Sequence, residues 1–184
     1  MPPLCPPLTD AEWPEVLADM RTGFAGQLNV YRVMAHHPAL LSAWRDLRHH
    51  VVKENTLGRE RSEVAILRTG HRLGSRYEWG HHVSRGRACG MSDARIASIG
   101  GAPGGMSPED ATIATAVDEL LDDGRLGQET LQALMSLIGT QGVFDVMATV
   151  GMYSTLGYIV NTFDTPLDAD VEADLLARPL SPGS

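Results

Sequence analysis

Repeated signals for the start and end of helices constrain this fold more than any other feature of the sequence. Ser107 precedes Pro108 and the acidic pair Glu109-Asp110, apolar residues then recur every three or four positions, and Gly124 follows. A capping serine, a first-turn proline and early acidic residues are typical of a helix start, and glycine is typical of a helix end. No segment shows the alternating pattern of a half-buried β-strand. The sequence therefore predicts an all-α fold.

Similar signals predict the other helices. Thr9 and Glu12 form a capping box, Pro38 opens a helix at its first position, and Ser92 with Asp93 opens a short helix. The predicted helices span residues 9–23, 38–47, 59–73, 77–82, 92–100, 108–123, 128–138 and 142–163.

Length and composition fit a single domain. The chain has 184 residues, of which 43% are apolar and 21% charged, so it suits one hydrophobic core and is too apolar for disorder. We expect a Pro-rich N-terminal arm at residues 1–8, one helical domain at residues 9–178 and a flexible tail at residues 179–184. The Gly/Pro-rich segment 100–105 separates two helical halves of this domain.

Charge and cysteine content argue against several classes of protein. The net charge is −8, and 15 Lys and Arg are scattered among 23 Asp and Glu, so no basic stripe suits nucleic acid. No stretch reaches the ~20 apolar residues of a membrane span, and the first residues do not resemble a signal peptide. Cys5 and Cys89 form neither a disulfide framework nor a Cys-x-x-Cys pair. We therefore expect a cytoplasmic protein that binds neither nucleic acid nor membrane.

Three side chains are the candidate catalytic groups. Glu78 and His82 lie four residues apart on a predicted helix, so they share a face and could exchange protons. Glu63 lies in the first turn of an upstream helix that is apolar on more than one face, as buried helices are. The structural alternatives are a surface pair that adds ~0.2–0.5 kcal/mol of helix stability and compensation of the helix dipole by Glu63. Burial would decide between these readings.

Arginines are candidates for binding an anionic substrate. Arg68 and Arg72 lie one turn apart on the Glu63 helix, and Arg85 lies about one turn beyond His82. Any of them could hold a carboxylate with two hydrogen bonds, although each could equally be a solvated surface residue. Other candidate substrate-binding residues, for which core packing is the alternative, are Tyr77, Trp79, Tyr153 and Asn161.

Seven histidines raise the alternative of a metal site. Adjacent residues on a helix point ~100° apart, so the two histidines of a His-His pair cannot readily bind the same metal ion. This applies to each of the three pairs in the sequence. Glu78 and His82 could bind zinc or another divalent metal if Glu63 or His71 supplied a third ligand. No His-x-x-x-His spacing is present, and we expect a protein without a metal or cofactor.

The order of these motifs resembles a known family. Glu63, then Tyr77-Glu78-Trp79 with His82, then Gly90 and Ser92-Asp93, is similar to the carboxymuconolactone decarboxylase family, and the similarity covers roughly residues 30–165. The family shares its fold with AhpD-like alkylhydroperoxidases. The resemblance implies an all-α, AhpD-like helical bundle that forms a homo-oligomer, such as a trimer, hexamer or dimer, with pockets near the subunit contacts.

One departure from the peroxidase branch bears on function. That branch has a Cys-x-x-Cys pair before the helical histidine, and here the matching positions are Ser75 and Glu78. A dithiol cycle needs a thiolate that attacks peroxide and a second thiol that resolves the product. Cys89 lies eleven residues after Glu78, a spacing at which it cannot replace the missing thiol. Alkylhydroperoxidase activity is therefore the least favoured alternative.

Retention of Glu63, Glu78 and His82 without the cysteines favours proton transfer. The resemblance implies decarboxylation, or a related lyase or isomerase reaction, on a small carboxylated lactone or cyclic ketone. Such a reaction needs a donor to stabilise an enolate oxygen and an acid to protonate carbon. His82 could fill either role, with Glu63 or Glu78 orienting its second ring nitrogen. The alternative is a non-catalytic oligomeric scaffold in which the three residues form a buried structural network.

Overall fold

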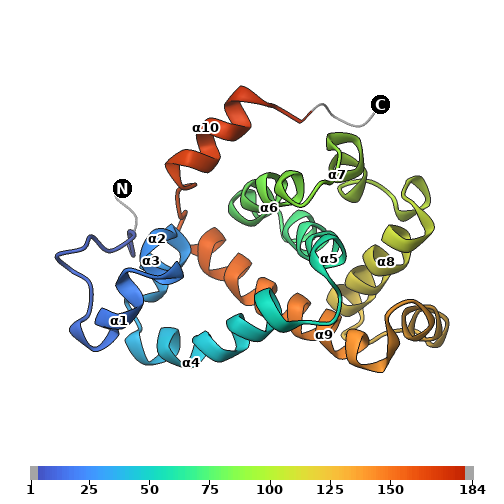
Figure 1. Ribbon diagram of the computed structural model, residues 1–184, viewed down its shortest axis with the longest axis horizontal. Helices are drawn as coiled ribbons and strands as arrows, with labels where there is room; N and C mark the ends of the chain where they lie inside the picture. Colours follow the sequence, from blue (N-terminus) through green and yellow to red (C-terminus); the bar gives the residue numbers. More distant parts are fainter. Residues whose placement is uncertain (1–3, 181–184) are drawn as a thin grey trace.

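The computed structural model describes residues 4–180, and this part of the chain contains ten α-helices and no β-strand (Figure 1). The all-α prediction is thus confirmed. The helices are α1 (Ala18–Arg21), α2 (Phe24–Gln27), α3 (Asn29–Met34), α4 (Pro38–His49), α5 (Arg59–Arg72), α6 (Arg76–Ala88), α7 (Asp93–Ile99), α8 (Pro108–Asp122), α9 (Gln128–Thr162) and α10 (Ala169–Ala177). Three shorter helical turns are η1 (Glu15–Leu17), η2 (His50–Glu54) and η3 (Pro103–Gly105). Parts of the predicted arm and tail, at residues 1–3 and 181–184, lie outside the described residues.

Most predicted helix starts are confirmed by their caps. The side chains of the predicted caps Ser92 and Ser107 each accept a hydrogen bond from the backbone N–H three residues later, and Ser75, which was not predicted as a cap, does the same for α6. The predicted helix at residues 9–23 is wrong. Thr9 and Glu12 do bond to each other, but Pro14 has an extended backbone and only η1 and α1 follow. Helices α2, α3 and α10 were not predicted, because all three are short and lack a capping serine or threonine.

Helix α9 lies at the centre of the fold and crosses it diagonally in Figure 1. Gly139 has a left-handed backbone (φ 70°) that divides the helix into the two segments expected from the sequence. By length and composition alone α9 could cross a membrane, a possibility that was not expected from the sequence. In this fold it packs against α5, α6 and α8 and carries the buried Asp145. Asp145 accepts hydrogen bonds from His50 and Thr56, which tie α9 to the segment before α5.

Two apolar cores lie on either side of α5. One contains residues of α3, α4 and the last part of α9 from Met152 on, and the other contains residues of α7, α8 and the part of α9 up to Val150. On α5, Ile66 belongs to the first core, whereas Val64, Ala65 and Leu67 belong to the second. Helix α5 is therefore buried on several faces, as its sequence predicted.

Helices α5 and α6 approach each other closely at Gly70. A Cβ atom at this position would lie 3.2 Å from Cβ of Glu78 and 3.2 Å from the backbone nitrogen of Trp79. Such contacts are tighter than ordinary packing, so a larger residue would push the helices apart. Because of this close approach, α5, which carries Glu63, packs directly against α6, which carries His82.

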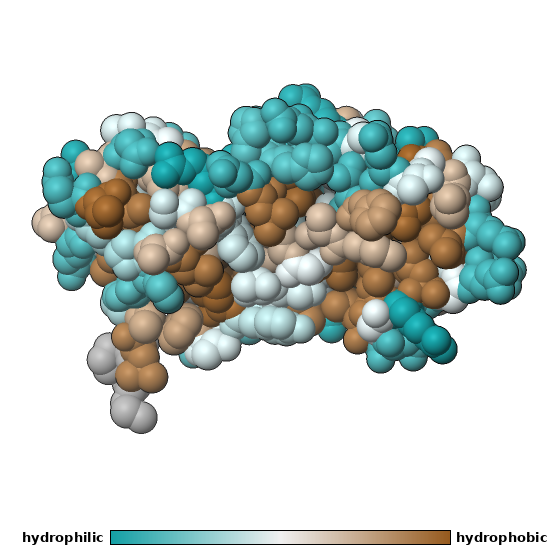
Figure 2. All heavy atoms as spheres, turned by 90° about the horizontal axis from the view of Figure 1, so that it is seen from below, coloured by the Kyte–Doolittle hydropathy of each residue, from teal (hydrophilic) through white to brown (hydrophobic). Residues whose placement is uncertain are grey.

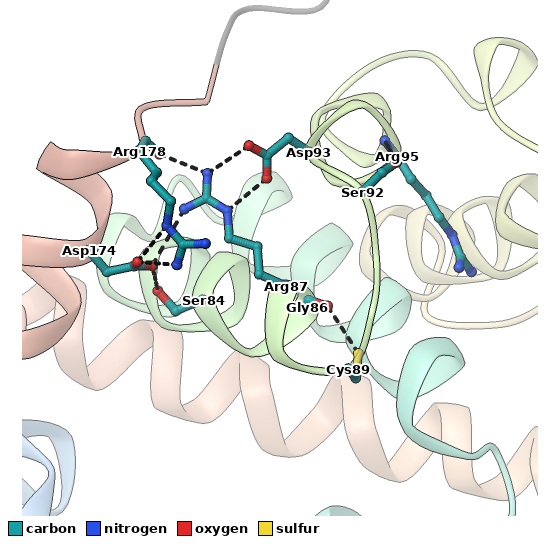
Figure 3. A network of polar contacts seen from close by, with 9 residues as sticks. All are labelled: Ser84, Gly86, Arg87, Cys89, Ser92, Asp93, Arg95, Asp174 and Arg178. Carbon is teal, nitrogen blue, oxygen red and sulfur yellow. Dashed lines mark hydrogen bonds and ion pairs between the residues drawn. The ribbon is translucent and has the colours of Figure 1, made fainter.

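Helix α10 is fastened to α6 at both ends. At its start, Asp168 accepts a hydrogen bond from the hydroxyl of Tyr77 at 2.5 Å and lies 2.9 Å from Nε2 of His81. Near its end, Asp174 accepts hydrogen bonds from Ser84 and Arg87 of α6 (Figure 3). Helix α10 thereby fixes the position of α6, the helix that carries His82.

Apolar side chains also reach the surface. Figure 2 shows several apolar patches on the side of the molecule that faces downward in Figure 1, where α4 and α9 lie. The large apolar residues exposed on these two helices are Leu40, Leu47, Met135, Phe144, Met147 and Tyr158.

Candidate active site

A cavity of about 530 Å³ lies where α4, η2, α5, α6 and α9 meet. Glu63 of α5 and His82 of α6 both line it, and Tyr153 of α9 closes one side. Of the three candidate catalytic residues, Glu63 and His82 therefore reach a cavity that is open to solvent. Glu78 does not line this cavity.

Glu63 and His82 form a close pair. Nδ1 of His82 lies 2.6 Å from Oε2 of Glu63, and the imidazole ring is only 1% exposed. Burial lowers the pKa of His82, and this effect outweighs the opposing effect of the Glu63 charge. The ring is therefore neutral at pH 7 and carries one proton. We place it on Nδ1, because the bond to the Glu63 carboxylate needs a donor there.

Glu78 lies on the other side of the same ring. Its Oε2 atom is 3.8 Å from Nε2 of His82, and its Oε1 atom is buried without a hydrogen-bond partner among the described residues. Burial raises the pKa of Glu78 to about 8, although Arg85 acts in the opposite direction. Glu78 is thus a neutral carboxylic acid at pH 7. Of the two glutamates beside His82, the fully buried one is thus Glu78.

The cavity carries an excess of positive charge. Its lining contains one carboxylate, Glu63, and the four cations Arg48, Lys53, Arg59 and Arg85. None of these cations makes an ion pair within residues 4–180. Lys53 and Arg59 are exposed, whereas Arg48 and Arg85 are half-buried. An unpaired charge that is partly removed from water is costly, so Arg48 and Arg85 favour an anionic ligand.

Arg85 is the predicted substrate-binding arginine that the structure brings to the site. Burial acts to lower its pKa, but Tyr153, Glu63 and other neighbours outweigh this effect, so the guanidinium stays charged. Burial also raises the pKa of Tyr153 well above its usual range, which keeps the phenol protonated. The Tyr153 ring meets the His82 ring edge-on, with centroids 5.0 Å apart. A charged donor and a neutral donor thus lie beside the Glu63–His82 pair.

Arg48 is a site residue that the sequence did not reveal. Its guanidinium lies over the ring of Phe24, 4.1 Å from the centroid, and its Nε atom is buried without a hydrogen-bond partner among residues 4–180. The residue ends a helix whose polar side is otherwise exposed, and no local motif distinguishes it from a surface arginine. Only the folded arrangement of α4 beside α3 and α9 brings Arg48 to the cavity.

Arg68 and Arg72, two predicted substrate-binding residues, do not reach the cavity. Arg68 is buried and makes two hydrogen bonds to the carboxylate of Asp118, at 2.7 and 2.6 Å. Arg72 pairs with Asp118 and with Asp122. Both arginines face α8, because their side of α5 packs against that helix. Their role in this structure is to join α5 to α8.

The remaining predicted substrate-binding residues are also away from this cavity. Trp79 packs beside His71, with ring centroids 5.7 Å apart. The hydroxyl of Tyr77 is engaged by Asp168. Asn161 donates a hydrogen bond to the carbonyl of Leu73 and, with Tyr77, lines a separate open cavity of about 550 Å³. Among the four non-arginine candidates, only Tyr153 reaches the Glu63–His82 pair.

The described residues 4–180 contain no group of three His, Cys, Asp or Glu side chains arranged to hold a metal ion. His71, one of the possible third ligands, lies beside Trp79. Cys89 does line the main cavity, where its thiol donates a hydrogen bond to the carbonyl of Gly86. Burial and the charges of Glu63 and Glu60 raise the pKa of this thiol, so it is less available as a thiolate.

Comparisons with known proteins agree with this fold. Residues 38–117, which include Glu63, Glu78, His82 and Arg85, match the carboxymuconolactone decarboxylase family. A point variant of the debrominase Bmp8 in complex with 2,3,4-tribromopyrrole has a similar structure, with a TM-score of 0.72, 15% identity, and coverage of 96% of this chain and 98% of that chain. The apo form of Bmp8 gives a TM-score of 0.72, 14% identity, and coverage of 94% and 96%. No curated protein sequence matches this chain significantly.

These findings define the class of the protein. The fold is the AhpD-like helical fold, and residues 38–117 match the carboxymuconolactone decarboxylase family, which the motif around Glu78 and His82 resembles. The positions that hold the paired cysteines of the peroxidase branch are here a helix cap, Ser75, and the buried acid Glu78.

Proposed function

We propose that this protein is a cofactor-free acid–base enzyme that decarboxylates a small carboxylated lactone or cyclic ketone. The observation that carries the proposal is the Glu63–His82 pair, with its 2.6 Å contact, on the wall of a cavity whose four cations lack partners among residues 4–180. The family match and the likeness to a debrominase both favour catalysis. They do not specify the reaction, which we infer from the chemistry of the lining.

Each group in the cavity has a part in the proposed reaction. Arg85 and Arg48 attract the anionic substrate and orient it by charge-assisted hydrogen bonds. The bond between the ring carbon and the carboxylate breaks, carbon dioxide leaves, and the electron pair moves into the conjugated carbonyl as an enolate. The protonated phenol of Tyr153 is suited to stabilise that oxygen. A proton delivered from the Glu63–His82 pair to carbon completes the reaction.

The competing proposals fit the geometry less well. A scaffold protein would bury the three residues in a closed network, whereas Glu63 and His82 line an open cavity with cations that are unpaired in the described part of the chain. A dithiol peroxidase would need two adjacent thiols near His82. Cys89 is the single cysteine among the cavity residues, and Ser75 and Glu78 occupy the positions of the thiol pair.

Release of carbon dioxide tests the proposal. The purified protein would be incubated with a panel of carboxylated lactones and cyclic keto acids, and carbon dioxide would be measured for the wild type, His82→Gln and Glu172→Gln. We expect release by the wild type and by Glu172→Gln, since Glu172 is exposed on α10. His82→Gln should lose about 10²- to 10⁴-fold in rate. Equal rates for the wild type and His82→Gln on every substrate would contradict the proposal.

Self-association is a second part of the proposal. The resemblance to the family implies a homo-oligomer, and α9 exposes the large apolar side chain of Phe144 (68% exposed) together with Met147. A second copy of this chain packed against α9 would remove these side chains from water. Sedimentation of the wild type and Phe144→Glu tests this. We expect an oligomer that Phe144→Glu weakens, and a monomeric wild type would contradict it.

A further inference from the structure

The two carboxyl groups beside His82 occupy different environments. Glu63 touches Nδ1 and lines the open cavity, where a substrate can reach it. Glu78 faces Nε2 at 3.8 Å and lines instead a small void of about 10 Å³ behind the ring. The imidazole therefore stands between an accessible carboxylate and an inaccessible carboxylic acid.

The residues around Glu78 separate its carboxyl proton from solvent. The groups that line the void with it are the phenols of Tyr31, Tyr77 and Tyr153, the rings of His81 and His82, and Arg85. On the side of α5, Gly70 packs against its Cβ. Arg85 is the one permanent charge in this set, and Oε1 of Glu78 has no partner among the described residues. The void gives the carboxyl group room to move towards Nε2.

We propose that Glu78 is an internal proton store that supplies, through His82, the proton consumed at Glu63 in each turnover. The inference rests on the proposed function, because decarboxylation consumes one proton when carbon replaces its bond to carbon dioxide with a bond to hydrogen. Glu78 does not touch the cavity, so it acts through His82 and is a positioning and proton-storing residue.

The proton transfers balance in three steps. Glu63, protonated by Nδ1 of His82, gives its proton to the substrate carbanion and returns to the carboxylate form. The O–H of Glu78 gives its proton to Nε2 of His82 as Nδ1 loses its own. The site is left with a Glu78 carboxylate and a neutral His82 protonated on Nε2. Uptake of one proton from solvent and reversal of the ring tautomer restore the resting state.

This relay predicts a specific resting state. At neutral pH, Glu78 should hold its proton, and His82 should be neutral with hydrogen on Nδ1 and a bare Nε2 that faces Glu78. When Glu78 ionises above about pH 8, a negative charge appears beside Nε2, and the imidazole should respond. A purely structural Glu78 that was ionised throughout would produce no such response.

NMR of ¹⁵N-histidine in the intact protein tests the relay without any substrate. The His82 signals would be assigned by their loss in His82→Gln and followed from pH 6 to pH 9.5. We expect the Nδ1–H tautomer at pH 7 and a step in both ring ¹⁵N shifts near pH 8. Glu78→Gln should remove the step, because its amide has a similar shape but no titrating proton. Glu172→Gln, at an exposed carboxyl, should keep it.

Several outcomes would overturn the inference. A His82 ring with both nitrogens protonated at pH 7 would do so, as would a step that survives in Glu78→Gln or is absent from the wild type. If Glu78→Gln does not fold, infrared spectroscopy of the wild type provides an independent measurement. A carboxylic acid carbonyl band should persist at pH 7 and disappear between pH 7 and pH 9, and its absence at pH 7 would contradict the proton store.

The test separates this inference from the proposed function. The NMR and infrared signals depend only on the resting protein, so they can confirm a neutral Glu78 even if no carbon dioxide is released from any substrate. Conversely, turnover with an unchanged His82 titration would support the enzyme and exclude Glu78 as its proton store.

Discussion

Glu63 and His82 are 19 residues apart in the sequence, yet Oε2 of the first lies 2.6 Å from Nδ1 of the second. The two residues come from helices that cross closely at Gly70. Each helix is fixed on its other side, α5 by the Arg68–Asp118 contact and α6 by the contacts of α10. Contacts on both helices thus hold the pair in place, and Nδ1 of His82 is the hydrogen-bond donor.

Replacing His82 tests whether this pair is needed for chemistry. His82→Gln keeps a polar side chain of similar size but cannot relay a proton. We expect a loss of about 10²- to 10⁴-fold in turnover while the far-ultraviolet circular dichroism stays that of a helical protein. Full turnover in a folded His82→Gln variant would show that the chemistry lies elsewhere.

Replacing Arg85 should weaken ligand binding without weakening the fold. Arg85 is half-buried and forms no ion pair within residues 4–180, so Arg85→Met leaves no carboxylate without a salt-bridge partner. We expect affinity for a carboxylate ligand to fall by about 10- to 100-fold, the equivalent of one charged hydrogen bond. The urea midpoint should stay equal to that of the wild type or rise.

Arg68→Met is the matched control for Arg85→Met. Arg68 is buried and paired with Asp118, so removing it leaves Asp118 with Arg72 alone and the carbonyls of Ile99 and Gly101 without their donor. We expect a clear fall in the free energy of unfolding, of about 1–3 kcal/mol, because Asp118 keeps its ion pair with Arg72. If Arg85→Met were the more destabilising of the two variants, the assignment of Arg85 to ligand binding would be wrong.

Thiol chemistry can be tested by removing both cysteines. Cys89 lines the cavity, but its pKa is raised and its hydrogen bond to Gly86 can be made equally by serine. We expect the double variant Cys5→Ser, Cys89→Ser to keep its turnover within about twofold, a barrier change well below 1 kcal/mol. A large loss of rate would favour thiol chemistry and count against acid–base catalysis.

The Asp168 contacts predict an acid-sensitive attachment of α10. Burial acts to raise the pKa of Asp168, but contacts with His81, Tyr77 and the Asn29 N–H outweigh it and hold the pKa below its usual value. A depressed carboxyl pKa stabilises the fold above the unfolded value of about 3.9. This stabilisation is lost as the pH falls through the lower folded-state pKa.

Hydrogen exchange of α10 checks this prediction. At pH 6, Asp168→Asn should increase amide exchange in α10 and lower the free energy of unfolding by about 1–3 kcal/mol. The difference between variant and wild type should shrink at pH 3, which is below the unfolded-state pKa of about 3.9, because part of the charge-dependent stabilisation is then lost. A difference that is the same at both pH values would contradict the assigned charge state.

The sequence predicted the helices whose signals are local. Caps such as Ser92 and Ser107 need only neighbouring residues, and these helices lie where expected. The helix at residues 9–23 failed because Pro14 outweighed the Thr9–Glu12 capping box. Helix α10 depends on distant contacts with α6, which leave no periodic signal in its own sequence.

The Glu63–His82 pair could be predicted from the sequence, whereas the arginines that line the cavity could not be told apart from those that do not. Glu63 and His82 follow from a spacing that the family shares, and Arg85 lies on the same helix as His82. The choice among arginines depends on α8, because Asp118 engages Arg68 and Arg72 from a distant part of the chain. Arg48 enters the site only through the packing of α4. Such tertiary pairings cannot be read from spacing along the sequence.

A ligand-bound structure would show whether the cavity beside Glu63 and His82 binds the substrate. Crystals of the wild type would be soaked with a carboxylated lactone that the enzyme binds. We expect the ligand in the 530 Å³ cavity, with its carboxylate within hydrogen-bond reach of Arg85 or Arg48 and a ring carbon or oxygen within reach of Glu63. A ligand that occupied another site, or that lay in this cavity with its carboxylate away from both arginines, would contradict this expectation.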